Sequence, residues 1–279
     1  MSGSKFPKHD LSEGHIDTCQ ICGANDLKFV IDLGHQVPCD SLPTLKQLNQ
    51  EEKTYPLRVF WCEDCCLAQI DYVVPPGVLF YAEYPYQSGI TPTLVKKLRG
   101  LSSTVKEKYS LEPPALVVDI GSGDGTLLSG FKDLNFKTLG VEPTNIAKIA
   151  NKAGIDTIQK FFNEKLAKEI FKDYGKASVV TASNVFAHIA HLGEMIRGVD
   201  HLLSEDGLFI IESHYLLDII EKIQYDSIYH EHLKFYSLKS IIRLLDYYDF
   251  TVVDVERIEN YGGSIRIFAA KGKSRSIAE

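Results

Sequence analysis

Leu116-Val-Val-Asp-Ile-Gly-Ser-Gly-Asp-Gly125 is the segment from which the architecture of the chain can be worked out. Its first five residues have the composition of a buried strand, three glycines follow within five positions, and an amphipathic helical pattern comes next. Glycines in such a turn let a ligand approach the backbone closely at the N-terminus of a helix. This order predicts a parallel α/β sheet that binds a nucleotide-type ligand.

Strand-like apolar runs and helical stretches continue to alternate after this turn, as they do in parallel α/β sheets. The further strands are expected at residues 137–141, 155–158, 178–182, 207–212, 251–256 and 264–270. Only residues 257–263 separate the last two strands, and that connection is too short for a parallel crossover. We therefore predict a Rossmann-like sheet of seven strands that closes with an antiparallel pair.

The acid that ends the second expected strand bears on the identity of the ligand. Glu142 lies 21 residues after Gly121, where a carboxylate can accept hydrogen bonds from both hydroxyls of a ribose. A dinucleotide-binding turn has the spacing G-x-G-x-x-G, but Thr126 stands here at the position of the third glycine. Asp119 suits a ligand with a charged amino group better than a pyrophosphate. NAD binding, or a merely structural Glu142, is the competing interpretation.

All six cysteines lie within the first 66 residues, and four of them form the pairs Cys19-Gln-Ile-Cys22 and Cys62-Glu-Asp-Cys65. Two intervening residues let both thiolates of a pair bind one tetrahedral ion, so the pairs predict a four-cysteine zinc site. Such a site has no open coordination position, and its zinc is expected to be structural. The alternatives are His35 as a substitute ligand, four free cysteines, or a redox pair; Cys39 and Cys66 are spare.

Composition and charge exclude several functional classes. The chain has 279 residues, a formal net charge of -7 and a sequence pI of about 5.7. A protein that tracks nucleic-acid phosphates is usually basic, so nucleic acid is not an expected partner. No apolar run approaches the ~20 residues that span a bilayer, and residues 1–10 lack the apolar core of a signal peptide. We therefore expect a cytoplasmic protein without membrane contact, in which cysteines stay reduced.

A connector follows the second cysteine pair. Val73-Val-Pro-Pro-Gly77 interrupts regular structure, and an aromatic stretch that includes Tyr84 and Tyr86 comes next. A helix is expected over residues 91–109, because apolar residues recur there at helical spacing. The aromatic stretch either packs between two domains or forms a lid over a site, where tyrosines offer a ring face and a hydroxyl together.

Six of the nine histidines fall between His188 and His232. Asn184 and His188 follow the fourth expected strand, and ligands bind beyond the carboxyl ends of such strands. Tyr229-His-Glu-His232 then places four proton-handling side chains in succession, at most two of which would converge if the segment is extended. A second metal site and a structural role stay open, but general acid–base chemistry is favoured.

The motifs together resemble a known enzyme family. Val118-Asp-Ile-Gly-Ser-Gly-Asp-Gly125 looks like the first motif of class I methyltransferases, which implies S-adenosylmethionine rather than NAD as the ligand. The whole order of motifs resembles the sugar C-methyltransferases, which act on nucleotide-linked keto-deoxysugars. Besides the cysteine pairs and the glycine turn, these motifs are Gly140-Val-Glu-Pro143, Asn184-Val-Phe-Ala-His188, Ile228-Tyr-His-Glu-His232 and Tyr261-Gly-Gly-Ser-Ile-Arg266.

The resemblance implies roles for individual residues. His232 corresponds to the histidine taken as the general base of the family, and Tyr84 matches a tyrosine that faces its active site. The expected pocket partners of the base are Tyr229, Glu231, His188 and Asn184. The expected cofactor contacts are Asp119, Gly121, Gly123, Gly125, Glu142, Phe162, Tyr86 and Ser88. For Phe162, core packing is the equal alternative to contact with the adenine.

The implied architecture is a class I methyltransferase domain at residues 113–279, preceded by a small zinc-binding domain at residues 1–75 and a connector with a helix at residues 76–112. Members of the family usually continue into a third domain that helps to hold the nucleotide of the substrate. This chain ends soon after Arg266, as a truncated chain or a shorter relative with a smaller acceptor would, and Tyr261 stands where the family has a histidine.

The expected reaction has two parts. A base removes the proton from a carbon beside a ketone, and the resulting enolate attacks the sulfonium methyl of the cofactor in line. A near-neutral imidazole suits the first part, especially if Glu231 orients it, and Asn184 and His188 can stabilise the enolate oxygen. The expected partner is a small molecule, a nucleotide-linked sugar. O- or N-methylation is the alternative reaction, and a non-enzymatic scaffold is the third interpretation.

Overall fold

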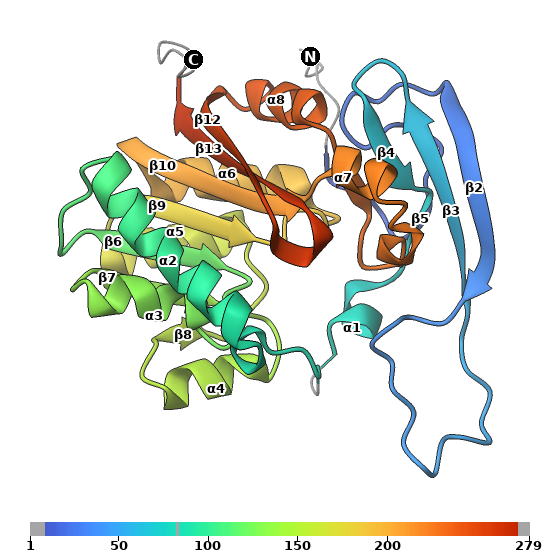
Figure 1. Cartoon of the computed structure of the whole chain (residues 1–279), viewed down its shortest axis with the longest axis horizontal. Helices are drawn as coiled ribbons and strands as arrows, with labels where there is room; N and C mark the ends of the chain where they lie inside the picture. The colour runs from blue at the N-terminus through green and yellow to red at the C-terminus, as the bar shows by residue number, and fades with distance from the viewer. Residues whose placement is uncertain (1–8, 82–83, 273–279) are drawn as a thin grey trace.

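The computed structural model describes residues 9–81 and 84–272, so the outermost ends of the expected N- and C-terminal domains, including the polar residues 1–8, lie outside the description. Figure 1 shows a large sheet between helices and, beside it, a smaller antiparallel sheet. Within the described ranges, no helix combines the length and the apolar character needed to cross a membrane.

The large sheet has seven strands in the order β12-β13-β10-β9-β6-β7-β8. Along the chain they are β6 (Leu116–Ile120), β7 (Lys137–Val141), β8 (Thr157–Ile158), β9 (Ala177–Ser183), β10 (Leu203–His214), β12 (Phe250–Ile258) and β13 (Ser264–Lys271). Strands β6 to β10 pair in parallel, and β13 is antiparallel to both β10 and β12. The predicted sheet and its closing antiparallel pair are therefore confirmed, although β8 is shorter than expected.

The position of the site follows from the strand order. From β6 the chain runs outward through β7 to β8, and it then returns to the other side of β6 to form β9 and β10. The loops that leave the carboxyl ends of β6 and β9 diverge at this reversal, and a crevice opens between them. The glycine-rich turn that follows β6 therefore lies at the edge of this crevice.

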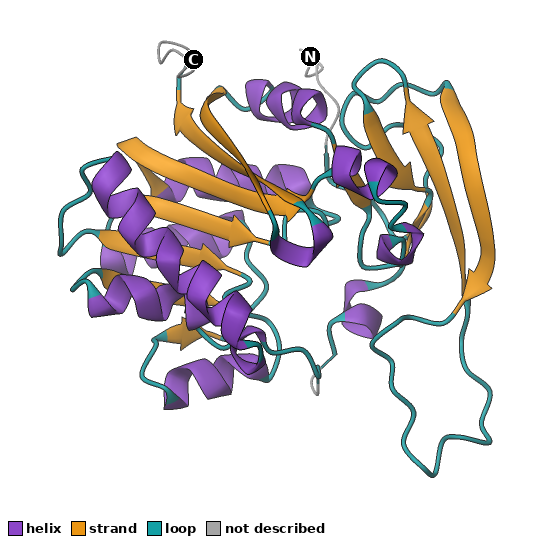
Figure 2. Ribbon diagram, in the orientation of Figure 1, coloured by secondary structure: helices purple, strands orange, loops and turns teal. Residues whose placement is uncertain are grey.

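Helices cover both faces of the large sheet, as Figure 2 shows. One apolar core joins a sheet face to α5 (Glu164–Tyr174), α6 (Leu192–Leu202) and α8 (Leu238–Asp246). A second core joins the opposite face to α2 (Pro92–Lys108), α3 (Thr126–Asp133) and α4 (Ile146–Lys152). The helix expected at residues 91–109 is α2, whose buried residues include Leu98, Leu101 and Val105.

The smaller sheet draws its strands from both halves of the chain. Its order is β11-β4-β3-β2, with β2 (Leu27–Gln36), β3 (Tyr55–Cys62) and β4 (Leu67–Ile70) from the N-terminal part. The fourth strand, β11 (Lys234–Tyr236), comes directly after the Tyr-His-Glu-His segment and pairs antiparallel with β4. The short strands β1 (Gly14–His15) and β5 (Tyr72–Val73) pair beside it. The N-terminal sheet is thus completed by a strand from the C-terminal half.

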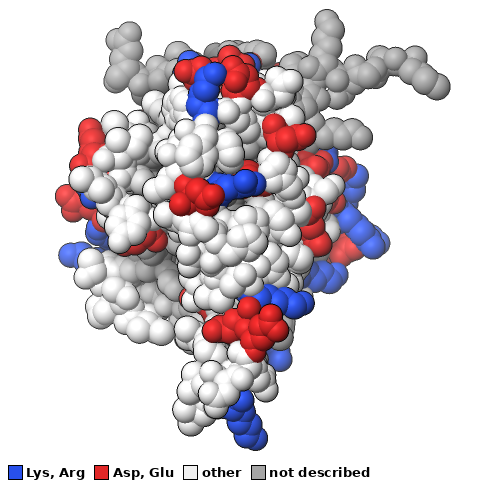
Figure 3. All heavy atoms as spheres, turned by 90° about the vertical axis from the view of Figure 1, so that its right-hand side faces the viewer, with Lys and Arg blue, Asp and Glu red and all other residues white. Residues whose placement is uncertain are grey.

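The outer side of the smaller sheet is poor in charge. Figure 3 views the molecule from this side and shows a broad central area without charged side chains.

An apolar cavity of about 510 Å³ lies between the sheet and α7 (Leu216–Glu221), where Val30, Trp61 and Ile220 are among its lining residues.

Four thiols meet at the end of the smaller sheet. The Sγ atoms of Cys19, Cys22, Cys62 and Cys65 all lie within 4.8 Å of one another. The Sγ atoms of Cys19 and Cys65 are 3.4 Å apart, and those of Cys22 and Cys62 are 3.5 Å apart. Bonds of ~2.3 Å to a tetrahedral zinc put sulfurs at about this separation, so the cluster fits the ion. His35, Cys39 and Cys66 are outside the cluster.

The two cysteine turns also pack against the large domain. Cys19, Cys62 and Cys65 are buried in the same core as residues of α8. Ser237, which caps α8, donates a hydrogen bond of 2.6 Å from its Oγ to the carbonyl of Cys66. The zinc-binding turns are therefore packed into a core that they share with the large domain.

We predict that Cys65→Ser loses zinc and destabilises the protein by about 4 kcal/mol or more, because removing a structural metal is among the strongest single-residue effects. Metal content and urea denaturation measure both effects. Cys66→Ser is the matched control, since its thiol is outside the cluster, and it should keep zinc and stability. Full zinc occupancy in Cys65→Ser would contradict the assignment.

We also predict that Gly130→Ala destabilises the protein by about 1–3 kcal/mol, even though alanine favours a helix over glycine by ~1 kcal/mol. A Cβ at Gly130, in α3, would lie 2.5 Å from the carbonyl oxygen of Arg99 in α2 and force the helices apart. Gly100→Ala, in α2, is the control. A Cβ there meets nothing within 4 Å, so this change should raise the denaturation midpoint.

Candidate active site

A cavity of about 510 Å³ opens at the carboxyl ends of the parallel strands. Its walls come from the glycine turn after β6, the ends of β7, β9 and β10, the connector, the segment before β11 and the turn between β12 and β13. All the expected site residues except Gly125 and the four zinc-binding cysteines line it. The structure thus brings both expected groups, cofactor contacts and proton-handling residues, into one space.

The three glycines of the turn serve different purposes. Each has a positive φ, +67° at Gly121, +53° at Gly123 and +80° at Gly125. A Cβ at Gly121 would collide with Val185 at 2.3 Å, whereas one at Gly123 would meet only the Ser88 Oγ, at 3.9 Å. Gly123 therefore leaves backbone exposed to the cavity.

Gly125, the third expected cofactor glycine, lies behind the wall of the cavity. Gly125 precedes α3 in a left-handed conformation and is not among the lining residues. A Cβ there would lie 2.9 Å from Ile155, so the missing side chain makes room for packing behind the cavity.

Two carboxylates stand beside the turn. Asp119 is buried and accepts a hydrogen bond of 2.6 Å from the Thr181 hydroxyl, and its burial raises its pKa to about 7. Glu142 accepts hydrogen bonds from the N–H groups of Gly123, at 3.1 Å, and of Thr144, at 2.9 Å. Glu142 is thereby fixed at the mouth of the turn.

The cavity wall also offers polar atoms without partners. The Oγ atoms of Ser122 and Ser183 and the Oδ1 of Asn184 are buried and make no hydrogen bond within the protein. Buried polar atoms of this kind lower the stability of the fold unless a hydrogen-bond partner is bound to them. A ligand with an amino group and hydroxyls, as S-adenosylmethionine has, can supply the missing partners, so the residues fit this group.

Aromatic residues close the cavity around this region. Phe162 both lines the cavity and packs on α6, where a Cβ at Gly198 would meet its ring at 3.0 Å, so its packing leaves the ring at the cavity wall. The hydroxyls of Tyr86 and Tyr261, one from the connector and one from the turn before β13, lie 2.6 Å apart at the cavity. The aromatic connector therefore borders the site.

The Tyr-His-Glu-His segment is a turn, closed by a hydrogen bond of 3.0 Å from the N–H of His232 to the carbonyl of Tyr229. Tyr229, Glu231 and His232 all line the cavity. His230 instead points away and contacts the Tyr55 carbonyl at 3.2 Å. The expectation that at most two side chains converge is wrong, because it assumed an extended backbone.

His232 is held in one tautomer. Its Nδ1 lies 2.7 Å from the carbonyl oxygen of Ser227, which can only accept, so Nδ1 carries the hydrogen. Its Nε2 then has a free lone pair and accepts a hydrogen bond of 2.8 Å from the Tyr229 hydroxyl. Burial, and then the neighbouring His188 and His214, lower the pKa of His232 well below its usual value, so the ring is neutral.

Glu231 does not orient His232, contrary to the expectation, because the Ser227 carbonyl already holds the ring. Its Oε2 accepts a hydrogen bond of 2.9 Å from Tyr84 and lies 3.9 Å from the Nδ1 of His188. Burial raises the pKa of Glu231 to about 7. Burial also lowers the pKa of His188 to about 3, and Phe80 stacks on its ring at a centroid distance of 5.8 Å.

The lining residues that sequence reasoning missed include Asp40, Phe80, His214 and Tyr261. Asp40 lies 3.2 Å from the Tyr84 hydroxyl, in a loop of the N-terminal part without any motif. The edge of the Tyr261 ring packs against His214. The one available signal was Tyr261-Gly-Gly-Ser264, where the tyrosine replaces a histidine of the resembled family.

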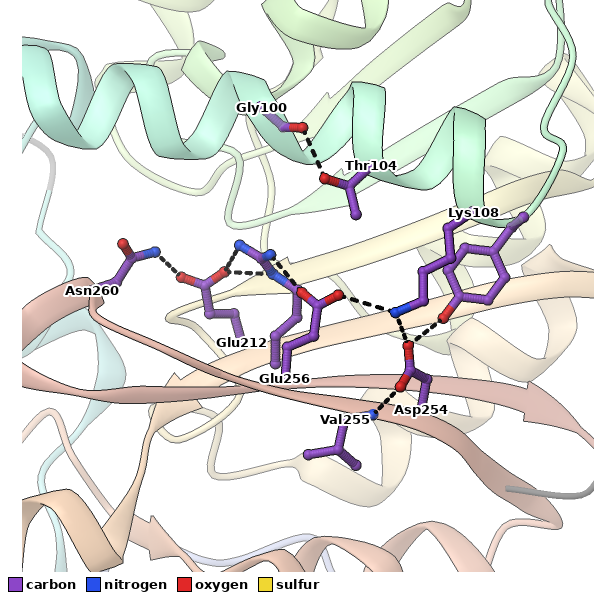
Figure 4. Close-up of polar contacts among 10 residues, drawn as sticks. Gly100, Thr104, Lys108, Glu212, Asp254, Val255, Glu256 and Asn260 are labelled. Carbon is purple, nitrogen blue, oxygen red and sulfur yellow. Dashed lines mark hydrogen bonds and ion pairs between the residues drawn. The ribbon is translucent and has the colours of Figure 1, made fainter. Parts of the chain in front are cut away.

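A buried ionic network holds the turn that carries Tyr261. Glu212 of β10 is fully buried and accepts hydrogen bonds from Asn260, at 2.5 Å, and from the guanidinium of Arg266, at 3.0 Å. Figure 4 shows the network continuing through Glu256 to Lys108 of α2. The backbone carbonyl of Glu212 also accepts a hydrogen bond of 2.8 Å from the N–H of Asn184. This one residue of β10 therefore positions two parts of the cavity wall.

Comparison with known proteins agrees with this geometry. A family model of a zinc-binding domain matches residues 19–80, and a model of a methyltransferase domain matches residues 94–255. The C-methyltransferase NovU of Streptomyces niveus is 34% identical over 256 residues, which are 91% of this chain and 61% of NovU. The chain therefore spans less than two thirds of that relative.

Solved structures share the fold at low identity. The PH0226 protein of Pyrococcus horikoshii OT3 aligns with a TM-score of 0.52 and 14% identity, over 67% of this chain and 94% of its own. An S-adenosylmethionine-dependent methyltransferase of Archaeoglobus fulgidus aligns with a TM-score of 0.50 and 16% identity, over 64% and 98%. Since the methyltransferase model spans more than half of the 279 residues and the sheet has the class I order, the chain belongs to the S-adenosylmethionine-dependent methyltransferases and carries an N-terminal zinc-binding domain.

Proposed function

We propose that this chain transfers a methyl group from S-adenosylmethionine to a carbon next to a ketone, on a nucleotide-linked keto-deoxysugar. The observation that carries the proposal is the convergence of Tyr229, Glu231 and His232 with His188 on the cavity that the glycine turn borders. The similarity to NovU, which is named a C-methyltransferase, supports carbon as the acceptor atom.

We assign the cofactor to the side of the cavity next to β6 and β7. When bound there, S-adenosylmethionine supplies an electrophilic methyl group on a positively charged sulfur. The Asp119 carboxylate suits its amino group, since a cation nearby would offset the cost of burying that charge. Glu142 suits the ribose hydroxyls, and the open backbone at Gly123 permits close approach. Phe162, Tyr86 and Ser88 line the same cavity.

We assign the base to the Nε2 of His232. Its ring is neutral and its Nδ1 is already committed to the Ser227 carbonyl, so Nε2 is the atom that takes the proton from the acceptor carbon. The Tyr229 hydroxyl, which donates to Nε2 in this structure, can rotate about its C–O bond. This rotation frees the lone pair and turns the hydroxyl hydrogen toward the developing enolate oxygen.

We assign Glu231 as the counter-charge for this step. An imidazolium formed in a buried cavity is costly, and an ionised carboxylate nearby offsets that cost. Asn184 and His188 line the same cavity, where an amide and a neutral imidazole can hydrogen-bond the acceptor. Tyr84 holds Glu231 in place through its hydroxyl.

The charge of the cavity bears on the acceptor. Five acidic residues line it, and no lysine or arginine of the described residues does. A phosphate inside the cavity would meet only like charge, so the part of the acceptor that enters is uncharged. The ketone-bearing sugar ring meets this condition, and the phosphates of a nucleotide-linked sugar are then held outside this cavity.

We predict that His232→Gln lowers turnover by about 10²–10⁴-fold while the cofactor still binds, because it removes the proton acceptor and leaves the glycine turn intact. Mass spectrometry of products from candidate keto-sugar nucleotides measures turnover, and calorimetry measures cofactor binding. In D2O, the parent should also exchange the hydrogen next to the ketone, and the variant should not.

His230→Gln is the matched control for this prediction, because the neighbouring histidine faces the Tyr55 carbonyl and not the cavity. An amide in its place can still donate to that carbonyl, and turnover should stay within about twofold of the parent. Methylation without exchange of the hydrogen next to the ketone would instead point to an oxygen or nitrogen acceptor.

We predict that kcat/KM of the parent rises with pH through about 7, where Glu231 ionises. The Tyr84 hydroxyl stabilises the ionised carboxylate and so lowers its pKa. Tyr84→Phe removes that donor, so the pKa of Glu231 rises further. The rising part of the kcat/KM profile should then shift to higher pH by ~1 unit.

Tyr81→Phe is the control, since the Tyr81 hydroxyl donates to the backbone carbonyl of Asp40 and not to Glu231. Its pH profile should match that of the parent. An unchanged limb in Tyr84→Phe would rule out Glu231 as the group that titrates.

A further inference from the structure

Gln20 lies inside the first zinc-binding turn, between Cys19 and Cys22, yet its side chain turns inward and is only 3% exposed. Its Nε2 donates two hydrogen bonds, one of 3.0 Å to the carbonyl of Ile70 and one of 3.1 Å to the carbonyl of Leu233. Leu233 directly follows His232 in the chain. A single side chain therefore links a zinc-binding turn to the segment of the assigned base.

The contact fixes the peptide that follows the base. The Leu233 carbonyl accepts from Gln20 and also from the N–H of Ile70, at 3.1 Å, so both of its lone pairs are occupied. The N–H of Leu233 donates to the carbonyl of Ala187 at 3.1 Å. Because Ala187 precedes His188, the Leu233 backbone joins the segments that carry His188 and His232 to the zinc-binding turn.

Other bonds from β11 hold the same loop but do not involve the zinc-binding turns. The buried Lys234 donates from its Nζ to the carbonyl of Ile189 at 2.8 Å, and the Tyr236 hydroxyl donates to the carbonyl of Phe186 at 3.3 Å. The side chain of Gln20 thus connects a zinc-binding turn directly to the backbone of Leu233.

Core packing alone does not account for a glutamine at this position. Its Oε1 is buried and has no hydrogen-bond partner, and such an unpaired acceptor costs stability. An apolar side chain of similar length would avoid the unpaired acceptor, but it would remove a donor from the carbonyls of Ile70 and Leu233. The amide is explained if its two N–H groups, both used on carbonyls, serve a geometric purpose.

We propose that Gln20 is a positioning residue through which the zinc-binding turn sets the placement of His232 for proton transfer. This inference rests on the proposed function for the role of His232. Zinc fixes the turn, Gln20 fixes the Leu233 carbonyl, and the base is held beside the acceptor. Displacements of about 1 Å at a reacting group can cost a hundredfold in rate, so one buried contact can matter.

The test is Gln20→Met, which keeps the length of the side chain and removes both donors. We expect it to retain zinc, to bind S-adenosylhomocysteine within about threefold of the parent, and to lower kcat by ~10–100-fold with a smaller change in KM. A second readout does not depend on turnover. The Nδ1–H of His232, which bonds the Ser227 carbonyl, should exchange with solvent at least ~10-fold faster by NMR.

Glu63→Gln is the matched control, because Glu63 occupies the same place in the second zinc-binding turn but is exposed. It should leave zinc content, kcat and the exchange rate unchanged. If Gln20→Met does not fold, Gln20→Asn gives the same comparison, since an amide one methylene shorter cannot reach the Leu233 carbonyl.

The outcomes separate this inference from the proposed function. A Gln20→Met protein with kcat and His232 exchange within twofold of the parent would overturn the inference, and so would loss of its zinc, since Gln20 would then act through metal retention. Absence of C-methylated product from the parent would instead overturn the proposed function, while the exchange comparison would still decide the role of Gln20.

Discussion

The pairing of β11 with β4 is the interaction on which the rest of the molecule depends. Three residues from the C-terminal half complete a sheet whose other strands lie in the first part of the chain. The turn that carries Tyr229, Glu231 and His232 comes immediately before them, so the pairing determines where this turn can lie. Residues of this turn and of the glycine turn line one cavity, and β4 follows directly from a zinc-binding turn that packs on the large domain.

Burial then determines the chemistry of the cavity. The same desolvation raises the pKa of Asp119 and of Glu231 to about 7 and keeps His188 and His232 neutral. Acids near neutrality and uncharged imidazoles suit proton removal from carbon, which needs a free lone pair and a nearby group that can carry charge. The zinc-binding part contributes to this environment, since Asp40 and the connector close one side of the cavity.

Much of the fold can be predicted from the sequence because the signals are local. Apolar runs, glycine and proline boundaries and the short link before β13 define the large sheet, and the spacing within each cysteine pair defines the zinc site. The family resemblance adds His232, Glu231 and Tyr84, all of which line the cavity, although their roles stay predictions. What could not be predicted depends on contacts between distant segments.

Gly125 is one example, since its need for a missing side chain arises from Ile155, which is far along the chain. The three residues of β11 are too few to show a strand pattern, and they form one only because β4 offers an open edge. The convergence of three side chains at residues 229–232 required a turn that the local sequence does not specify. The shifted pKa values of the site residues likewise depend on burial, which no sequence motif specifies.

The shared sheet also has a consequence for biosynthesis. β4 ends at Ile70, whereas its partner begins at Lys234, so roughly 160 residues are made before that edge can be covered. At ribosomal rates of about 5–20 residues per second, the edge waits for roughly 10–30 s. An uncovered strand edge can pair with the strands of other chains. Chaperones are therefore needed most while the N-terminal part has been made and β11 has not.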